Sequence, residues 1–94
     1  MRTIERSGDF RRDYKRIKAT PRYSKTIDYL LQELLQLLLA DAPLPSRNRD
    51  HTLSGNWQGY RECHIKPDLL LIYGKPDDDL LRLVRMGSHS ELFG

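Results

Sequence analysis

The beginning of the chain has the hydrophobic spacing of a short strand followed by an amphipathic helix. Apolar residues recur at i, i+4 and i+7, in the order Phe10, Tyr14 and Ile17. Ser7 or Asp9 can cap a helix that contains this stripe, and residues 3–6 before it form a strand-like run. The spacing therefore predicts a helix that packs on a core through one face.

A second helix is predicted by a wider apolar stripe. Its members are Ile27, Leu30, Leu31, Leu34, Leu35, Leu37 and Leu38. Ser24 can cap this helix, and the run ends at Asp41-Ala42-Pro43. Because only the break at Thr20-Pro21 separates the two helices, we expect them to form a hairpin.

The second half of the chain has strand-like runs joined by short turns. They cover residues 60–65, 69–75 and 80–86. Connections this short predict an antiparallel meander. Residues 44–58 form a loop, and residues 87–94 are too short for another element, although Leu92 and Phe93 can dock on the sheet. The predicted class is α+β, with an N-terminal strand and a helical hairpin packed on an antiparallel sheet.

Length and composition limit what this fold can be. The chain has 94 residues, of which 38% are hydrophobic and 31% charged, so we expect one soluble domain over residues 1–94 and exclude disordered and membrane proteins. The charged start is unlike a signal peptide. Cys63 is the single cysteine, so no intramolecular disulfide is possible. These features predict a protein of the cytoplasm without a membrane contact.

Positive charge is concentrated at the beginning of the chain. Residues 1–25 hold nine basic and three acidic residues, while the whole chain has a net charge of +3. On the first helix, the side opposite the apolar stripe carries Arg11, Arg12, Lys15, Arg16 and Lys18. A basic face of this kind suits phosphate binding, and a solvated helix surface is the alternative.

Three histidines in the second half are candidates for acid–base chemistry. They are His51 in the loop, His64 near a strand end and His89 after the last strand. Asp68 can orient an imidazole, and Arg85 can stabilise charge on a phosphate. Together they would form a metal-free ribonuclease without a cofactor. Surface histidines are the alternative, and a metal site is weaker still because no HxxxH or CxxC pair is present.

Cys63 and His64 are neighbours on a predicted strand, so their side chains should face opposite sides of the sheet. We interpret the thiol as a small buried residue. Trp57 and Tyr60 can stack on bases or anchor the loop to the sheet, and the anchoring interpretation is favoured.

An extended series of motifs in the second half resembles one protein family. The motifs are Asp50-His51-x-Leu53-x-Gly55-x-Trp57-x-Gly59-Tyr60-Arg61-x-x-His64-Ile65-x-Pro67-Asp68, Leu71-Ile72-Tyr73, Leu81-Arg82, Arg85-x-Gly87-x-His89 and Leu92-Phe93-Gly94. They are similar to the YafQ-type branch of the RelE/ParE toxin superfamily, and the similarity spans the whole chain. The resemblance implies a helical hairpin on an antiparallel sheet. Leu69 departs from the family pattern, which has tryptophan after the aspartate, so base stacking or codon preference would differ.

The same resemblance implies the toxin of a type II toxin–antitoxin pair, a ribosome-dependent endoribonuclease that cleaves messenger RNA in the A site and so inhibits translation. The implied catalytic residues are His51, His64, Asp68, Arg85 and His89, with His51 the first choice as base and His89 as acid. The implied substrate-binding residues are Phe93, Arg11, Arg12, Lys15 and Arg82.

The resemblance also implies partners: an antitoxin protein whose disordered segment folds over the toxin, and the ribosome with its messenger RNA. A ParE-like toxin that inhibits DNA gyrase without cleaving RNA is the alternative function. An inactive antitoxin-binding module is a third possibility. The three histidines favour the nuclease, because the gyrase-directed branch lacks that set.

Overall fold

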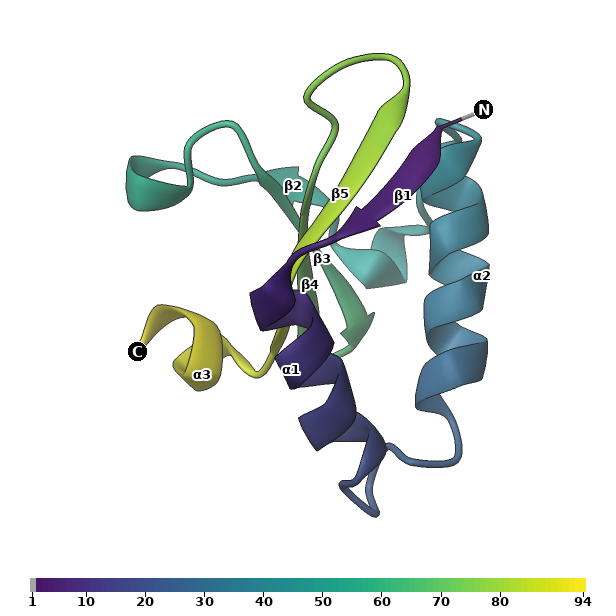
Figure 1. Ribbon diagram of the computed structural model, residues 1–94, viewed down its shortest axis with the longest axis vertical. Helices are drawn as coiled ribbons and strands as arrows, with labels where there is room; N and C mark the ends of the chain where they lie inside the picture. Colours follow the sequence, from purple (N-terminus) through teal and green to yellow (C-terminus); the bar gives the residue numbers. More distant parts are fainter. Residues whose placement is uncertain (1) are drawn as a thin grey trace.

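The computed structural model describes residues 2–94, which form a five-stranded sheet with three helices (Figure 1). In chain order the elements are β1 (Thr3–Arg6), α1 (Gly8–Lys18), α2 (Ile27–Leu39), β2 (His51–Thr52), β3 (Arg61–Lys66), β4 (Leu69–Gly74), β5 (Leu80–Gly87) and α3 (His89–Phe93). Short 3₁₀ turns at Ser46–Asn48 and Gly55–Trp57 flank β2. The predicted α+β class is confirmed.

The strands lie in the order β1-β5-β4-β3-β2. As predicted, β3, β4 and β5 form an antiparallel meander. β1 pairs with β5 in the parallel direction, with Thr3 opposite Leu80, so the predicted N-terminal strand is added in parallel to the antiparallel meander and the sheet as a whole is mixed. A parallel pair needs a long connection, and here the helices and the other strands separate β1 from β5.

Helices α1 and α2 cover one face of the sheet (Figure 1). Their buried residues, including Phe10, Ile17 and Leu38, pack with Leu71 and Leu83 of the strands. All six residues of β4 are buried, because this central strand is covered on both faces. Lys18 of α1 and Asp28 of α2 form an ion pair of 2.7 Å that joins the two helices.

The helix starts follow the capping rules in two of three cases. The Ser7 hydroxyl accepts a hydrogen bond from the amide of Phe10 and caps α1, as predicted. The prediction that Ser24 caps α2 was wrong, because turns continue to Thr26, which occupies the cap position without a side-chain hydrogen bond. Ser88 caps α3 with Glu91 in a capping box.

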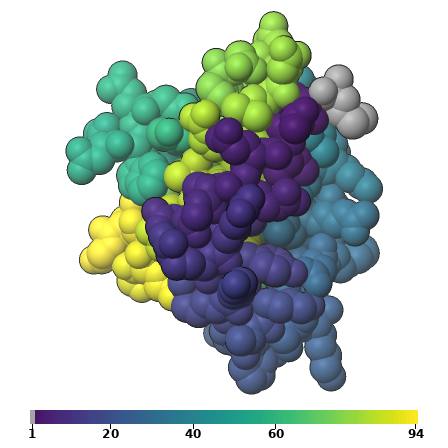
Figure 2. Space-filling model, viewed as in Figure 1, coloured from purple at the N-terminus to yellow at the C-terminus, as the bar shows by residue number. Residues whose placement is uncertain are grey.

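Two segments predicted to lack regular structure contain short elements. Within residues 44–58, His51 and Thr52 form β2 against β3. The tail forms α3, so the prediction that it is too short for another element was wrong, whereas Leu92 docks in a buried position as expected. Figure 2 shows the loop around β2 protruding above α3 on one side of the molecule.

Candidate functional site

The sheet face opposite α1 and α2 carries a second, smaller hydrophobic cluster. Leu70, Ile72 and Leu92 are buried in it, and the partly buried residues around them are Leu53, Trp57, Tyr60, Val84 and Phe93. The Trp57 ring meets the rings of Tyr60 and Phe93 edge-on, with centroid distances of 5.9 and 6.4 Å. Trp57 and Tyr60 therefore anchor the loop and α3 to the sheet.

Glu62 lies between two of the three histidines on this face. His51 of β2 pairs with Glu62 of β3, and His64 follows two residues later on the same side of the strand. Glu62 Oε1 is 3.7 Å from His51 Nε2 and 3.5 Å from His64 Nε2. Glu62 is only 5% exposed, so water screens the charge of its carboxylate weakly. It can stabilise either imidazole when that ring carries a proton.

Backbone carbonyls orient both imidazoles. His51 Nδ1 lies 2.7 Å from the carbonyl of Arg49, and His64 Nδ1 lies 3.3 Å from the carbonyl of Pro67. A carbonyl oxygen only accepts, so Nδ1 is the donor in each ring and Nε2 is directed toward Glu62. Sequence reasoning missed Glu62, although its two-residue spacing from His64 places both side chains on one face.

His64, Asp68 and His89 line a pocket of about 400 Å³. The other lining residues are Pro67, Leu70, Ser88 and Ser90. His89 is the first residue of α3, and its ring centroid lies 5.0 Å from that of Phe93. The structure thus brings His64, Asp68, His89 and Phe93 together, and joins His51 to them through Glu62.

Asp68 has partners other than the imidazoles. Its Oδ2 accepts a hydrogen bond of 2.8 Å from the Tyr23 hydroxyl and lies 2.6 Å from the Arg22 guanidinium. The Tyr23 hydrogen bond, followed by the charge of Arg22, lowers the pKa of Asp68. Within residues 2–94 no hydrogen bond or ion pair joins Asp68 to a histidine, so the expectation that it orients an imidazole is not met. Glu62 is the carboxylate that lies beside the imidazoles of His51 and His64.

Arg85 lies beside α1 and binds Asp13. Its Nε donates to Asp13 Oδ2 over 2.7 Å, and its Nη2 donates to Oδ1 over 3.2 Å. These hydrogen bonds raise the pKa of Arg85, which remains a cation. The Arg85 side chain is 26% exposed, so part of the guanidinium still faces solvent.

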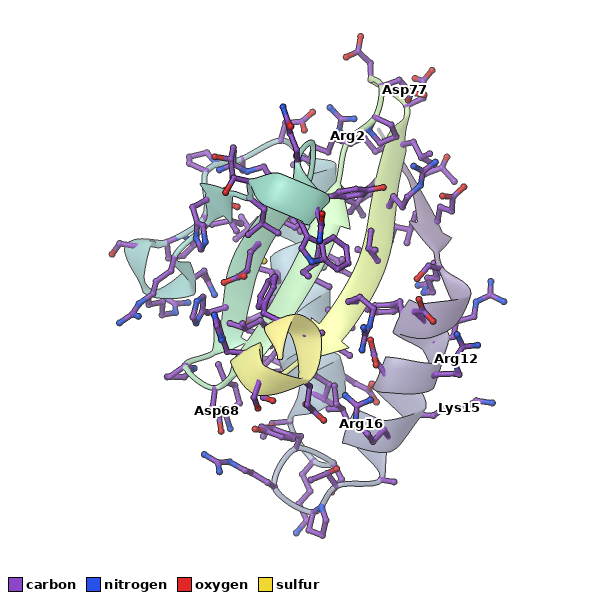
Figure 3. The ribbon with its side chains drawn as sticks, turned by 90° about the vertical axis from the view of Figure 1, so that its left-hand side faces the viewer. Arg2, Arg12, Lys15, Arg16, Asp68 and Asp77 are labelled. Atoms are coloured by element: carbon purple, nitrogen blue, oxygen red, sulfur yellow. The ribbon has the colours of Figure 1, made fainter. Side chains whose placement is uncertain are left out.

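The other predicted substrate-binding residues lie outside the histidine pocket. Arg82 pairs with Glu5 across β5 and β1, and Arg12 pairs with Asp9. Arg11 and Lys15 line a groove of about 680 Å³ with apolar walls from α1 and α2. In Figure 3, Arg12 and Lys15 project from α1 on one side of the view and Asp68 lies on the other, with α3 between them.

Residues next to the site are buried as strand alternation requires. Cys63 is fully buried against the helices while His64 faces the pocket, which confirms the predicted opposite faces, and burial raises the pKa of the Cys63 thiol. Leu69 is 1% exposed and belongs to the core beneath the helices, so it is not available for base stacking.

No helix within residues 2–94 is long and apolar enough to span a membrane.

Comparison with known proteins gives the family. The family model described as the bacterial toxin of a type II toxin–antitoxin system, YafQ, matches residues 2–94. This chain belongs to the YafQ toxin family. It is 42% identical over 94 residues to the mRNA interferase toxin YafQ of Escherichia coli strain K12, an alignment that covers all of this chain and 98% of that protein.

Solved YafQ structures have the same fold. The crystal structure of YafQ from E. coli BL21(DE3) is 40% identical, with a TM-score of 0.85 and full coverage of both chains. YafQ in the E. coli DinJ–YafQ complex is 42% identical, with a TM-score of 0.84 and full coverage of both chains. The predicted family and fold are therefore confirmed. The E. coli relatives are named mRNA interferases, which agrees with the predicted endoribonuclease and does not favour a gyrase inhibitor.

Proposed function

We propose that this YafQ family toxin is an endoribonuclease that cleaves messenger RNA in the ribosomal A site and so inhibits translation. The observation that carries the proposal is that three histidines lie close together on one side of the sheet. His51 and His64 both lie beside Glu62, and His64 and His89 line the same pocket. Histidine is suited to proton transfer near neutral pH. The family relationship supplies the substrate class, because the E. coli relatives are named mRNA interferases.

The proposed reaction is acid–base catalysis without a metal ion or cofactor. His51 takes the proton of a ribose 2′-hydroxyl, and the 2′-oxygen then forms a bond to the adjacent phosphorus. The bond from phosphorus to the 5′-oxygen breaks, and His89 gives its proton to that leaving oxygen. Glu62 stabilises His51 as it becomes an imidazolium, and His64 lies between the two reacting histidines. The products are a 2′,3′-cyclic phosphate and a 5′-hydroxyl.

Two further side chains contact the substrate in this proposal. Arg85 stabilises the negative charge that grows on the phosphate during the attack. Phe93 packs beside His89, with 5.0 Å between the ring centroids, and holds a base next to the acid. Asp68 forms the wall of the pocket as a carboxylate held by Tyr23.

We propose that the ribosome is held by the exposed basic residues of α1. Arg11, Arg12 and Lys15 are exposed on that helix, and Arg82 lies on β5. Ribosomal RNA offers a dense array of phosphates that such residues neutralise. This target places the action in the cytoplasm, with residues 1–94 acting as one domain. The cognate antitoxin is a second partner, since DinJ and YafQ of E. coli form a toxin–antitoxin complex.

Primer extension on a defined messenger in a reconstituted translation system tests the nuclease. The reactions contain wild-type protein, His89→Ala, or Tyr29→Ala, with and without ribosomes. Tyr29 is exposed on α2, away from the pocket, and is a control for surface truncation. We expect cuts at fixed codon positions that need both ribosomes and His89 and that persist in Tyr29→Ala. If no cuts appear although expression of the wild-type protein arrests the growth of cells, the nuclease is rejected and DNA gyrase is the next target to test.

Ribosome binding provides a separate test of α1. A triple variant in which Arg11, Arg12 and Lys15 are each replaced by glutamine should bind ribosomes more weakly. The plot of log affinity against log salt concentration should also become shallower, by the amount that corresponds to the loss of up to about three phosphate contacts. Sedimentation with ribosomes over a salt series measures both quantities. Unchanged binding and slope would show that these residues are an ordinary solvated helix face.

A further inference from the structure

A buried carboxylate on α1 lies next to the arginine that the proposed reaction assigns to the phosphate. β1 ends at Arg6, so the far half of β5 has no strand beside it on that side, and α1 takes the place of one. The Ser7 hydroxyl donates a hydrogen bond to the carbonyl oxygen of Val84, and the Asp13 carboxylate accepts one from the backbone amide of Met86. Asp13 is 3% exposed, although it lies on a helix whose other polar residues are largely exposed.

The Asp13 carboxylate is fixed independently of Arg85. Its Oδ2 accepts a hydrogen bond of 3.0 Å from the backbone amide of Met86, and its Oδ1 accepts one of 2.9 Å from Arg16 Nη1. Arg16 is itself held by Glu91 of α3, at 3.2 Å. Burial alone would raise the pKa of Asp13, but the hydrogen bonds from Arg85, Met86 and Arg16 lower it, so the group is ionised. The Asp13 carboxylate is therefore a rigid template: it is charged, it is held by a backbone amide, and it can fix the orientation of the flexible Arg85 side chain.

Arg85 meets this template with only part of its guanidinium. A guanidinium has five N–H donors, and Asp13 engages Nε and one position on Nη2. The bidentate contact fixes the plane of the group and leaves Nη1 for another acceptor. The side chain is 26% exposed, which permits such an acceptor to approach from solvent.

We propose that Asp13 is a positioning residue, which holds the Arg85 guanidinium in the orientation that meets the phosphate of the RNA. This inference rests on the nuclease function and on the role of Arg85 proposed above. Asp13 does not touch RNA. It acts by restricting the rotamers of Arg85, so its loss should slow the chemical step more than it weakens binding of the substrate.

A double-mutant cycle tests the proposal in the ribosome-dependent cleavage assay. The proteins are wild type, Asp13→Asn, Arg85→Ala, the double variant, and Asp28→Asn as a matched control. Asp28 is also a carboxylate that bonds to a lysine and a tyrosine, but it is exposed and lies on α2. Circular dichroism at the assay temperature selects conditions under which every variant is folded. Single-turnover cleavage rates and the concentration of programmed ribosomes at half-maximal rate are then measured.

We expect Asp13→Asn to lower the maximal cleavage rate about 10- to 100-fold, while the half-saturating ribosome concentration changes less than about twofold. The double variant should be no slower than Arg85→Ala, because Asp13 has nothing to position once Arg85 is removed. Asp28→Asn should cleave like wild type. A merely structural role for Asp13 would instead lower the folded fraction and multiply with the Arg85 effect.

Other outcomes overturn the inference. If Asp13→Asn cleaves at the wild-type rate while Arg85→Ala is slow, or if the two effects multiply, Asp13 does not act through Arg85, and the nuclease function stands. If Arg85→Ala cleaves at the wild-type rate, both the positioning role and the assigned role of Arg85 are rejected. If wild type itself cuts no RNA, the proposed function fails and the inference fails with it.

Discussion

Asp13 should also be among the most sensitive polar positions for stability. Replacing it with alanine removes two hydrogen bonds from Arg85, one from Arg16 and one from the amide of Met86, at 2.7, 3.2, 2.9 and 3.0 Å. The Met86 amide is then buried without an acceptor, and Arg85 loses the anion that offsets its desolvation. Removing one partner of a buried ion pair costs about 3–5 kcal/mol. The chain as a whole has a free energy of unfolding of about 5–14 kcal/mol at its length.

Urea unfolding measures this loss. Circular dichroism follows the helices, and the fluorescence of Trp57, the single tryptophan, follows the second cluster on the other face. We expect Asp13→Ala to lower the free energy of unfolding by about 3–5 kcal/mol with an unchanged m-value. Asp28→Ala, which removes an exposed carboxylate, should lower the free energy of unfolding far less than Asp13→Ala does. A loss below about 1 kcal/mol for Asp13→Ala would mean that water replaces the carboxylate, and would refute the estimate.

The contribution of the Asp13 carboxylate to stability should depend on pH, and the Asp13→Asn variant measures that dependence. The pKa of Asp13 is lowered in the folded chain, so its carboxylate stabilises the fold fully above the unfolded-state pKa of about 4. As the pH falls below about 4 toward the folded pKa, the unfolded chain takes up the proton first and this contribution disappears. The difference in melting temperature between wild type and Asp13→Asn should therefore be constant from pH 5 to 7 and narrow below pH 4. A difference that widens in acid would contradict the lowered pKa.

Three further predictions concern the loop and the core. The Tyr73 hydroxyl donates a hydrogen bond of 2.6 Å to Asp50, next to β2. Tyr73→Phe should therefore lower the free energy of unfolding by about 1–3 kcal/mol and speed hydrogen exchange of the amides near β2. Unchanged exchange would show that this hydrogen bond does not hold the loop. Gly59 has a φ of 94°, so Gly59→Ala should lower the free energy of unfolding in urea by about 1–2 kcal/mol. Gly8→Ala is the control: Gly8 lies in the first turn of α1, where alanine should leave the stability unchanged or raise it. Cys63 should react with Ellman's reagent only after unfolding, since its thiol is buried and its pKa raised; rapid labelling of the native chain would exclude this.

Local spacing in the sequence was sufficient for most of the fold. The helical stripe at Phe10 and Ile17 marks the buried side of α1, and alternation assigns Cys63 and His64 to opposite faces. The same stripe contains Asp13, three residues after Phe10 and four before Ile17, so its burial was readable from the spacing. Charge alone assigns the polar residues of this helix to a solvated or phosphate-binding surface.

The site required contacts that local spacing does not contain. The pairing of His51 with Glu62 joins two strands, and a strand of two residues has no period of its own. The partner of Arg85 lies 72 residues away in the chain, so the sequence did not show that a carboxylate holds it. By contrast, α3 had a local signal that was missed, because Ser88 and Glu91 have the spacing of a capping box.

A bulge in β5 explains how an arginine follows a strand of core residues. Leu81 and Leu83 point into the core beneath the helices, so strict alternation would direct residue 85 there as well. The register shifts between β4 and β5 where Ile72 pairs with Arg85 and Tyr73 pairs with Leu83, and after the shift Met86 points into the core. The extra residue thus changes the parity of the strand and turns Arg85 away from the core to its edge, where Asp13 holds it. The strand keeps its buried contacts on both sides of the bulge while presenting a cation next to α3, so the same backbone irregularity serves the packing of the core and the proposed chemistry of the site.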